Sequence, residues 1–314
     1  MRWEGKGEVA DPMEINWEGL LSVDDSWVTT HLCEQLGRQS PKLVIRAYSI
    51  KFSGTQQRID SFLNFVTNQI DRFCFSPKQI DEFAQRHEHP WREAQRYFGD
   101  ITPNSDGKLG ELLLYLFVEA ILRAPLVAHK VTFLTNPNDQ VKGSDGIFLG
   151  DYDGQPAILV GESKIRAALS TAVQEALEAL ERFHDTSAAL QYEITIASRM
   201  TRDDLSPQQL HHIANKLLVP SAEEHQACIK VHPILIVYKD VEIHNISVKA
   251  TTQAIAEALM GQYCETKLAT RCGTVDSKLT EHPRLAEVHL DFFLVPVSDV
   301  NALRETFYRF IHAL

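Results

Sequence analysis

The segment 143–164 constrains the fold most, because it contains the strongest short-range hairpin signal that a sequence offers. Asp153-Gly154 fits a two-residue type I′ turn, which needs positive φ at both central positions. Such a turn folds the apolar run 146–149 back onto the apolar run 157–160. We therefore predict an antiparallel β-hairpin around this turn.

This hairpin brings three ionic side chains together. Glu162 and Lys164 are two residues apart, so strand alternation projects both from one face and points Ser163 away. Asp145 begins the opposing strand and Glu162 lies near the end of its partner, which are adjacent ends of an antiparallel pair. The sequence thus predicts two carboxylates and an ammonium group in one small patch.

The chemistry that needs this trio is metal-assisted hydrolysis of a phosphodiester bond. Mg²⁺ prefers oxygen ligands and is usually held by one or two carboxylates plus substrate phosphate, which matches Asp145 and Glu162. Mn²⁺ is the alternative cation, and the backbone carbonyl of Ser163 is a further predicted ligand. Lys164 would act as a catalytic cation that orients the nucleophile or stabilises the attacked phosphate.

The Glu-x-Lys triplet is not specific by itself, because an acidic residue two positions before a lysine occurs five times in the chain. Only the triplet 162–164 ends an apolar strand that follows a turn. The alternative is an exposed strand end whose ion pair contributes at most about 1 kcal/mol, with Asp145 as an ordinary turn residue. We favour the metal-site interpretation, because charged side chains at the end of an apolar strand need a functional explanation.

Two predicted helices flank the hairpin. Residues 165–183 place apolar side chains at helical spacing, which predicts an amphipathic helix that packs on a sheet. On this helix, Gln174 is a candidate for contact with the substrate backbone, although glutamine is also an ordinary helix former. Residues 110–122 are apolar nearly all round, which is typical of a buried helix, and Pro125 marks its end.

Two glutamates interrupt this buried helix. Glu111 lies in its first turn, where the helix dipole favours a negative charge. The same position would let Glu111 serve as a further metal ligand, and both interpretations stay open. Glu119 is the weaker candidate for that role.

This order of elements resembles the core of the PD-(D/E)xK nucleases, with Ser144 where a proline usually precedes the aspartate. More closely, the motifs at 110–111, 143–146 and 161–164 are similar to the HamA family, the nuclease subunit of the Hachiman anti-phage defence system. The similarity is sharpest over residues 110–183.

The resemblance implies an α/β fold with a restriction-endonuclease-like core, in which a central mixed sheet is flanked by helices. It also implies a deoxyribonuclease that a partner helicase of superfamily 2, similar to HamB, holds inactive until that helicase engages invading DNA. The alternative is a catalytically inactive nuclease-fold adaptor that binds a helicase or a nucleic-acid complex, because folds outlive their sites.

The turn cluster 103–107 divides the chain into two predicted parts. Residues 1–102 form an N-terminal α/β extension, our candidate for partner binding, and residues 103–314 form the nuclease domain. Further predicted strands cover 42–52, 190–196, 229–238 and 288–297, and further predicted helices cover 56–73 and 299–311 and begin at Ser76-Pro77 and Ser206-Pro207.

Charge and composition limit how the chain meets DNA. The net charge is −11, which is wrong for a protein that binds DNA tightly alone, since phosphate neutralisation dominates such affinity. A local patch of Lys130, Lys142, Lys164 and Arg166 would supply substrate binding, with Lys142 and Arg166 as its best candidates; the alternative is a routine scatter of solvated cations. Otherwise a partner must deliver the DNA.

Other features point to an intracellular enzyme without other cofactors. No apolar segment approaches the roughly 20 residues of a membrane span and no signal peptide is apparent, so we expect a cytoplasmic protein. The five scattered cysteines predict free thiols. The sequence around Asp153-Gly154 lacks the glutamate of a calcium loop, because Val160 stands there, and no phosphate-binding glycine-rich loop is present.

Overall fold

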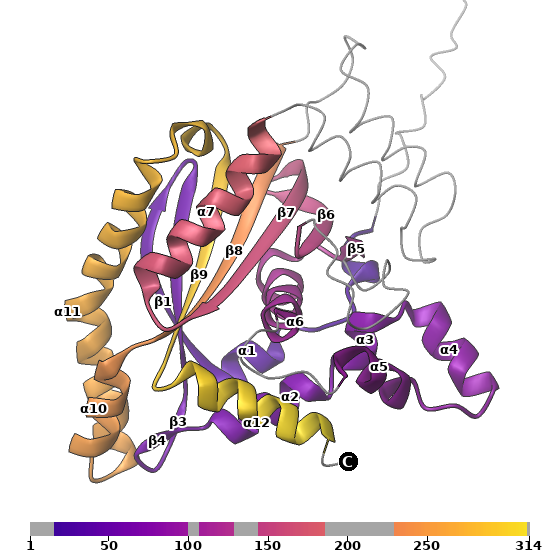
Figure 1. The fold of residues 1–314 in the computed structure, drawn as a ribbon, viewed down its shortest axis with the longest axis horizontal. Coiled ribbons are helices and arrows are strands. Elements are labelled where there is room, and N and C mark those ends of the chain that lie inside the picture. Colours follow the sequence, from indigo (N-terminus) through magenta and orange to yellow (C-terminus); the bar gives the residue numbers. More distant parts are fainter. Residues whose placement is uncertain (1–15, 100–106, 129–143, 186–228, 313–314) are drawn as a thin grey trace, which may run out of the picture.

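The computed structural model describes residues 16–99, 107–128, 144–185 and 229–312. Within these residues, one seven-stranded mixed sheet runs through the molecule in the order β1-β2-β9-β8-β7-β6-β5 (Figure 1). Its four central strands are parallel and its outer strands are antiparallel. In chain order the strands are β1 (Leu32–Ser40), β2 (Leu43–Ile50), β5 (Leu126–Ala128), β6 (Gly146–Tyr152), β7 (Gln155–Arg166), β8 (Ile229–Lys239) and β9 (His289–Val297).

Helices cover both faces of this sheet, as the sequence predicts (Figure 1). One face packs against α7 (Leu169–Asp185) and α11 (Gln253–Leu279). The other face packs against α1 (Ser26–His31), α2 (Ile59–Thr67), α6 (Lys108–Phe117) and α12 (Val300–His312). The sheet is therefore the middle layer of three.

The remaining elements are short. They are η1 (Glu18–Leu20), β3 (Phe52–Ser53), β4 (Gln56–Gln57), α3 (Ile70–Cys74), α4 (Pro77–Gln85), α5 (Pro90–Phe98), η2 (Val118–Leu122), α10 (Val241–Lys249) and η4 (Pro283–Glu287). None of the helices in the described part of the chain has the length and apolar character needed to cross a membrane.

The predicted hairpin is confirmed. β6 and β7 pair from Gly146 opposite Gly161 to Tyr152 opposite Gln155. Asp153 and Gly154 turn the chain with φ angles of 51° and 75°, which is the positive-φ geometry that the type I′ turn requires.

The predicted buried helix is also present as α6, in which every residue is buried. It continues into the π-helical turn η2 and stops at Arg123, whose φ of 54° is left-handed, two residues before Pro125. This fully buried helix lies in the core between the hairpin and the N-terminal helices.

The predicted amphipathic helix 165–183 begins later than expected, at Leu169. β7 runs on to Arg166, because Ile165 and Arg166 pair with Val237 and Tyr238 of β8. Pairing with a neighbouring strand outweighs the helical spacing of these first residues.

Most of the other predicted elements are confirmed where the structure describes them. Strands are found for 42–52, 229–238 and 288–297, and a helix for 299–311. The predicted helix 56–73 is divided into α2 and α3, and Ser76 opens α4 with a capping box. The predicted strand 190–196 and the helix at Ser206-Pro207 lie outside the described residues.

The N-terminal segment 1–102 contributes β1 and β2 to the same sheet as the segment 103–314. β2 pairs with β9, and Trp27 and Phe62 share one core cluster with Phe307 of α12. The two predicted parts of the chain therefore share both their sheet and their core.

Candidate active site

Glu162 and Lys164 are in direct contact on β7. The ammonium group of Lys164 donates to Oε1 of Glu162, and also to the backbone carbonyl of Ser163 at 3.2 Å. The Glu162 residue is only 4% exposed. In register, Glu162 and Lys164 lie beside Ile234 and Ile236 of β8, which pack against α7, so this ion pair lies on the α7 face of the sheet.

Asp145 is fixed to the residue between them. Its Oδ2 accepts hydrogen bonds from the backbone N–H of Ser163 at 2.8 Å and from the Ser163 hydroxyl at 2.7 Å. The backbone N–H of Asp145 donates to the carbonyl of Gly161 at 3.0 Å. Asp145 is buried as well. Its carboxylate is held at Ser163, whereas Glu162 pairs with Lys164, so the shared patch of the two carboxylates stays a prediction.

The first turn of α6 packs directly on Ser163 of β7. A Cβ atom added to Gly110 would lie 2.7 Å from the Ser163 hydroxyl and 3.4 Å from Ser163 Cβ. Only glycine permits such a close approach. Ser163 thus points toward α6, on the sheet face opposite to Glu162, as alternation along a strand requires.

Glu111 follows Gly110 and is buried in the same turn of α6. Its backbone N–H donates to the carbonyl of Gly107 at 3.0 Å. Glu111 therefore lies one residue beyond the contact between Gly110 and Ser163. Its role as a metal ligand stays a prediction.

Glu119, the weaker candidate for a metal ligand, is fully buried, and its carboxylate binds backbone N–H groups. Its carboxylate accepts from the N–H groups of Ser22 at 2.8 Å, Val23 at 3.1 Å and Leu126 at 3.1 Å. These three bonds fasten the N-terminal segment and β5 to η2, which is a structural role.

The oxygen atoms at this place suit a hard divalent cation. Asp145 and Glu162 provide carboxylate oxygens and Ser163 provides a carbonyl, the donors that Mg²⁺ and Mn²⁺ accept. Within the described ranges, no group of three or more His, Cys, Asp or Glu side chains is placed to hold a metal. A cation here would therefore depend on few protein ligands together with water and substrate oxygen, which is the usual arrangement for Mg²⁺.

Two of the predicted substrate-binding residues, Arg166 and Gln174, are described by the structure and contact different partners. Arg166 ends β7, where its Nε donates to Glu175 at 2.8 Å. Gln174 donates to Glu178 at 2.8 Å and lies 3.3 Å from Nε2 of His282, so these contacts hold it on α7. Lys130 and Lys142 lie outside the described residues.

One residue near the site has no signal in the sequence. Arg304 of α12 is buried, and its guanidinium donates to the carbonyl of Ile165 at 2.8 Å. The two residues are 139 positions apart, so only the completed sheet brings this cation to the end of β7.

A family model described as HamA matches residues 22–311, nearly the whole chain. A search of curated proteins found no significant match.

Proposed function

Because the chain belongs to the HamA family, which is part of the Hachiman defence system with a partner, we propose that it is a metal-dependent nuclease that hydrolyses phosphodiester bonds in DNA. The observation that carries the proposal is the contact between Glu162 and Lys164 beside the Asp145–Ser163 hydrogen bonds. Two buried carboxylates beside a partly buried lysine at a strand end are costly to keep without a function.

Each residue has a distinct role in this reaction. Asp145 and Glu162 would hold the cation with their carboxylates, and the Ser163 carbonyl would be a further ligand. When bound, Mg²⁺ or Mn²⁺ acidifies a water molecule and offsets charge on the attacked phosphate. Lys164 places a positive charge at that phosphate as negative charge develops on it. The two hydrogen bonds from Ser163 fix the orientation of Asp145.

The partner supplies the affinity for DNA that this acidic chain lacks. A net charge of −11 opposes tight binding to DNA. We therefore assign delivery of the DNA, and control of cleavage, to a helicase subunit of the same defence system.

The test is cleavage of a labelled DNA by the purified chain, with and without its partner, in Mg²⁺, Mn²⁺ or EDTA. Wild type is expected to cut only with a divalent cation, and Glu162→Ala and Lys164→Ala are expected to lose at least about 99% of that activity. Lys278→Ala and Glu281→Ala are the matched controls, because they break an ion pair of 3.0 Å on the surface.

Two results would overturn the proposal. Equal activity in wild type, Glu162→Ala and Lys164→Ala would remove the catalytic assignment. Wild type that cuts nothing under any of these conditions, while still binding its partner, would identify the chain as an inactive adaptor.

A further inference from the structure

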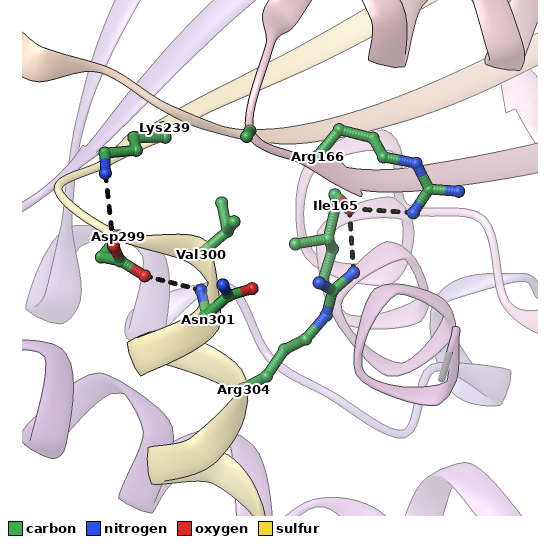
Figure 2. Close-up of a pocket in the computed structure, with 8 residues that line it drawn as sticks. Ile165, Arg166, Lys239, Asp299, Val300, Asn301 and Arg304 are labelled. Atoms are coloured by element: carbon green, nitrogen blue, oxygen red, sulfur yellow. Dashed lines mark hydrogen bonds and ion pairs between the residues drawn. The ribbon is translucent and has the colours of Figure 1, made fainter. Parts of the chain in front are cut away.

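A pocket of about 450 Å³ lies at the carboxyl ends of the parallel strands β7, β8 and β9 (Figure 2). Arg166 and Lys239 end β7 and β8, and Asp299 follows β9 just before α12. In open sheets with parallel strands, ligands bind beyond the carboxyl ends of the strands. The position of this pocket is therefore that of a binding site.

Cationic side chains dominate the polar lining. Arg166 and Arg304 both donate to the carbonyl of Ile165, at 3.1 Å and 2.8 Å, so two guanidinium groups from different elements converge on one point (Figure 2). Lys239 adds an ammonium group at the other side of the pocket (Figure 2). Arginine presents its N–H groups in a planar fork that matches phosphate oxygens.

Two carboxylates compensate part of this charge. Asp299 caps α12 by accepting from the N–H groups of Asn301 and Ala302 at 2.8 Å and 3.0 Å, and it lies 3.4 Å from the Lys239 ammonium. Glu175 pairs with Arg166. Three cations face two carboxylates, so the pocket and its immediate partners keep an excess of one positive charge, which equals the charge of one phosphodiester with opposite sign.

The pocket is also adjacent to the candidate active site. Arg166 follows Lys164 by two residues on β7, which is about 7 Å along a strand. Both side chains leave β7 on the same face, since side chains alternate. A nucleic-acid strand whose phosphate lies at Lys164 would therefore present a neighbouring phosphate to Arg166, at the edge of the pocket.

We infer that this pocket binds a backbone phosphate of the DNA strand that the Asp145–Glu162–Lys164 site cuts. The inference rests on the proposed function and extends it, because it assigns Lys239 and Arg304 to substrate binding. It also explains how a chain with a net charge of −11 holds a strand in register: a few cations are concentrated at one sheet edge.

The test measures binding of a fluorescein-labelled single-stranded oligonucleotide to the full chain by anisotropy at low salt, in EDTA to prevent cleavage. Lys239→Glu and Arg166→Gln are expected to weaken binding by about fivefold or more and to flatten its salt dependence by about one phosphate contact. Arg304→Gln is a third variant, interpreted only if its circular dichroism matches wild type.

Lys42→Glu is the matched control. Lys42 and Lys239 have side chains that are 45% and 48% exposed, and each pairs with a carboxylate. Lys42 lies at the opposite end of the parallel strands, just before β2, so Lys42→Glu is expected to bind like wild type. Competition with unlabelled oligonucleotide, dAMP and inorganic phosphate distinguishes a strand from a free nucleotide or a free anion.

Several outcomes would overturn the inference: no oligonucleotide binding by wild type, equal weakening by Lys42→Glu and Lys239→Glu, or displacement by dAMP at concentrations where the oligonucleotide has no effect. Cleavage in Mg²⁺, measured in parallel, separates the two proposals. Pocket-dependent binding without cleavage would contradict only the nuclease, and cleavage without pocket dependence would contradict only the phosphate site.

Discussion

Ser163 donates two hydrogen bonds to one carboxylate oxygen of Asp145, from its backbone N–H at 2.8 Å and from its hydroxyl at 2.7 Å. The two residues belong to opposite sides of the hairpin and are 18 positions apart. Ser163 also supplies the carbonyl that accepts from Lys164. One small residue therefore connects both ends of the candidate active site.

We expect Ser163→Ala to weaken metal use without unfolding the protein. The backbone N–H still donates to Asp145, but loss of the hydroxyl bond loosens the carboxylate. Residues that orient metal ligands typically change affinity or activity by about 10- to 100-fold, so the Mn²⁺ concentration for half-maximal cleavage should rise by about tenfold. Ser277→Ala, at an exposed serine of α11, should leave that concentration unchanged; an unchanged value in Ser163→Ala would contradict the role of the hydroxyl.

Gly110→Ala should destabilise the fold by about 1–3 kcal/mol, measured by urea unfolding. The new Cβ would lie 2.7 Å from the Ser163 hydroxyl. A loss of stability is informative here, because alanine normally stabilises a helix by about 1 kcal/mol relative to glycine. The clash involves a single oxygen atom, so adding Ser163→Ala should recover most of the loss.

The control for Gly110→Ala is Gly261→Ala on α11. Nothing lies within 4 Å of a Cβ at Gly261, so this variant should gain about 0.5–1 kcal/mol. Destabilisation of both variants by the same amount would mean that α6 does not pack on Ser163 as described.

Stability should fall as the pH is lowered from about 6.5 to about 4, in part because of His232. Burial lowers the pKa of His232 from 6.5 to about 4. The unfolded chain therefore binds more protons than the folded chain in this window, so the free energy of unfolding rises with pH there. The contribution of His232 to stability is fully present above about pH 6.5. Full protonation would cost up to about 3 kcal/mol.

His232→Gln isolates this contribution. Nδ1 of His232 lies 2.9 Å from the Val160 carbonyl and Nε2 lies 2.8 Å from Nε2 of His184, and a glutamine amide can donate and accept at such positions. The urea midpoint of this variant should change less between pH 6.5 and 4 than that of wild type. Identical slopes would show that another group causes the pH dependence.

Arg46→Met should destabilise the protein by about 3–5 kcal/mol, as expected when one partner of a buried ion pair is removed. Arg46 pairs with Asp291, whose side chain is 0% exposed and also accepts from the Tyr152 hydroxyl at 3.0 Å. Burial already raises the pKa of Asp291, and without Arg46 its charge would be left without this cation. Thermal unfolding measures the loss.

Arg309→Met tests whether burial causes that effect. Arg309 and Asp60 form an ion pair of 3.4 Å with side chains 62% and 75% exposed. Water screens such a pair, so the loss should stay below about 1 kcal/mol. Equal losses in Arg46→Met and Arg309→Met would contradict the buried-pair interpretation.

The hairpin was predictable because its signal is local. Asp153-Gly154 selects the turn, and the alternation of β7 separates Ser163 from Glu162 and Lys164. The capping box at Ser76 is equally local. In each case neighbouring residues determine the geometry without help from the rest of the chain.

Features that depend on distant segments were not predictable. The continuation of β7 to Arg166 requires β8 as a partner, and local spacing alone favoured a helix there. The convergence of Arg304 on Ile165 and the pairing of Arg46 with Asp291 join residues 139 and 245 positions apart. No periodicity in one sequence encodes such contacts.

The pairing of β2 with β9 decides how this protein can be shortened. Leu290 to Leu294 of β9 lie beside Leu43 to Ala47 of β2 along their whole shared length. Deleting residues 1–102 would expose the apolar edge of β9 with unpaired backbone amides. Exposed strand edges of this kind pair with other chains. A fragment of residues 103–314 should therefore aggregate during expression, so the proposed catalytic and partner-binding roles are better mapped by point substitution.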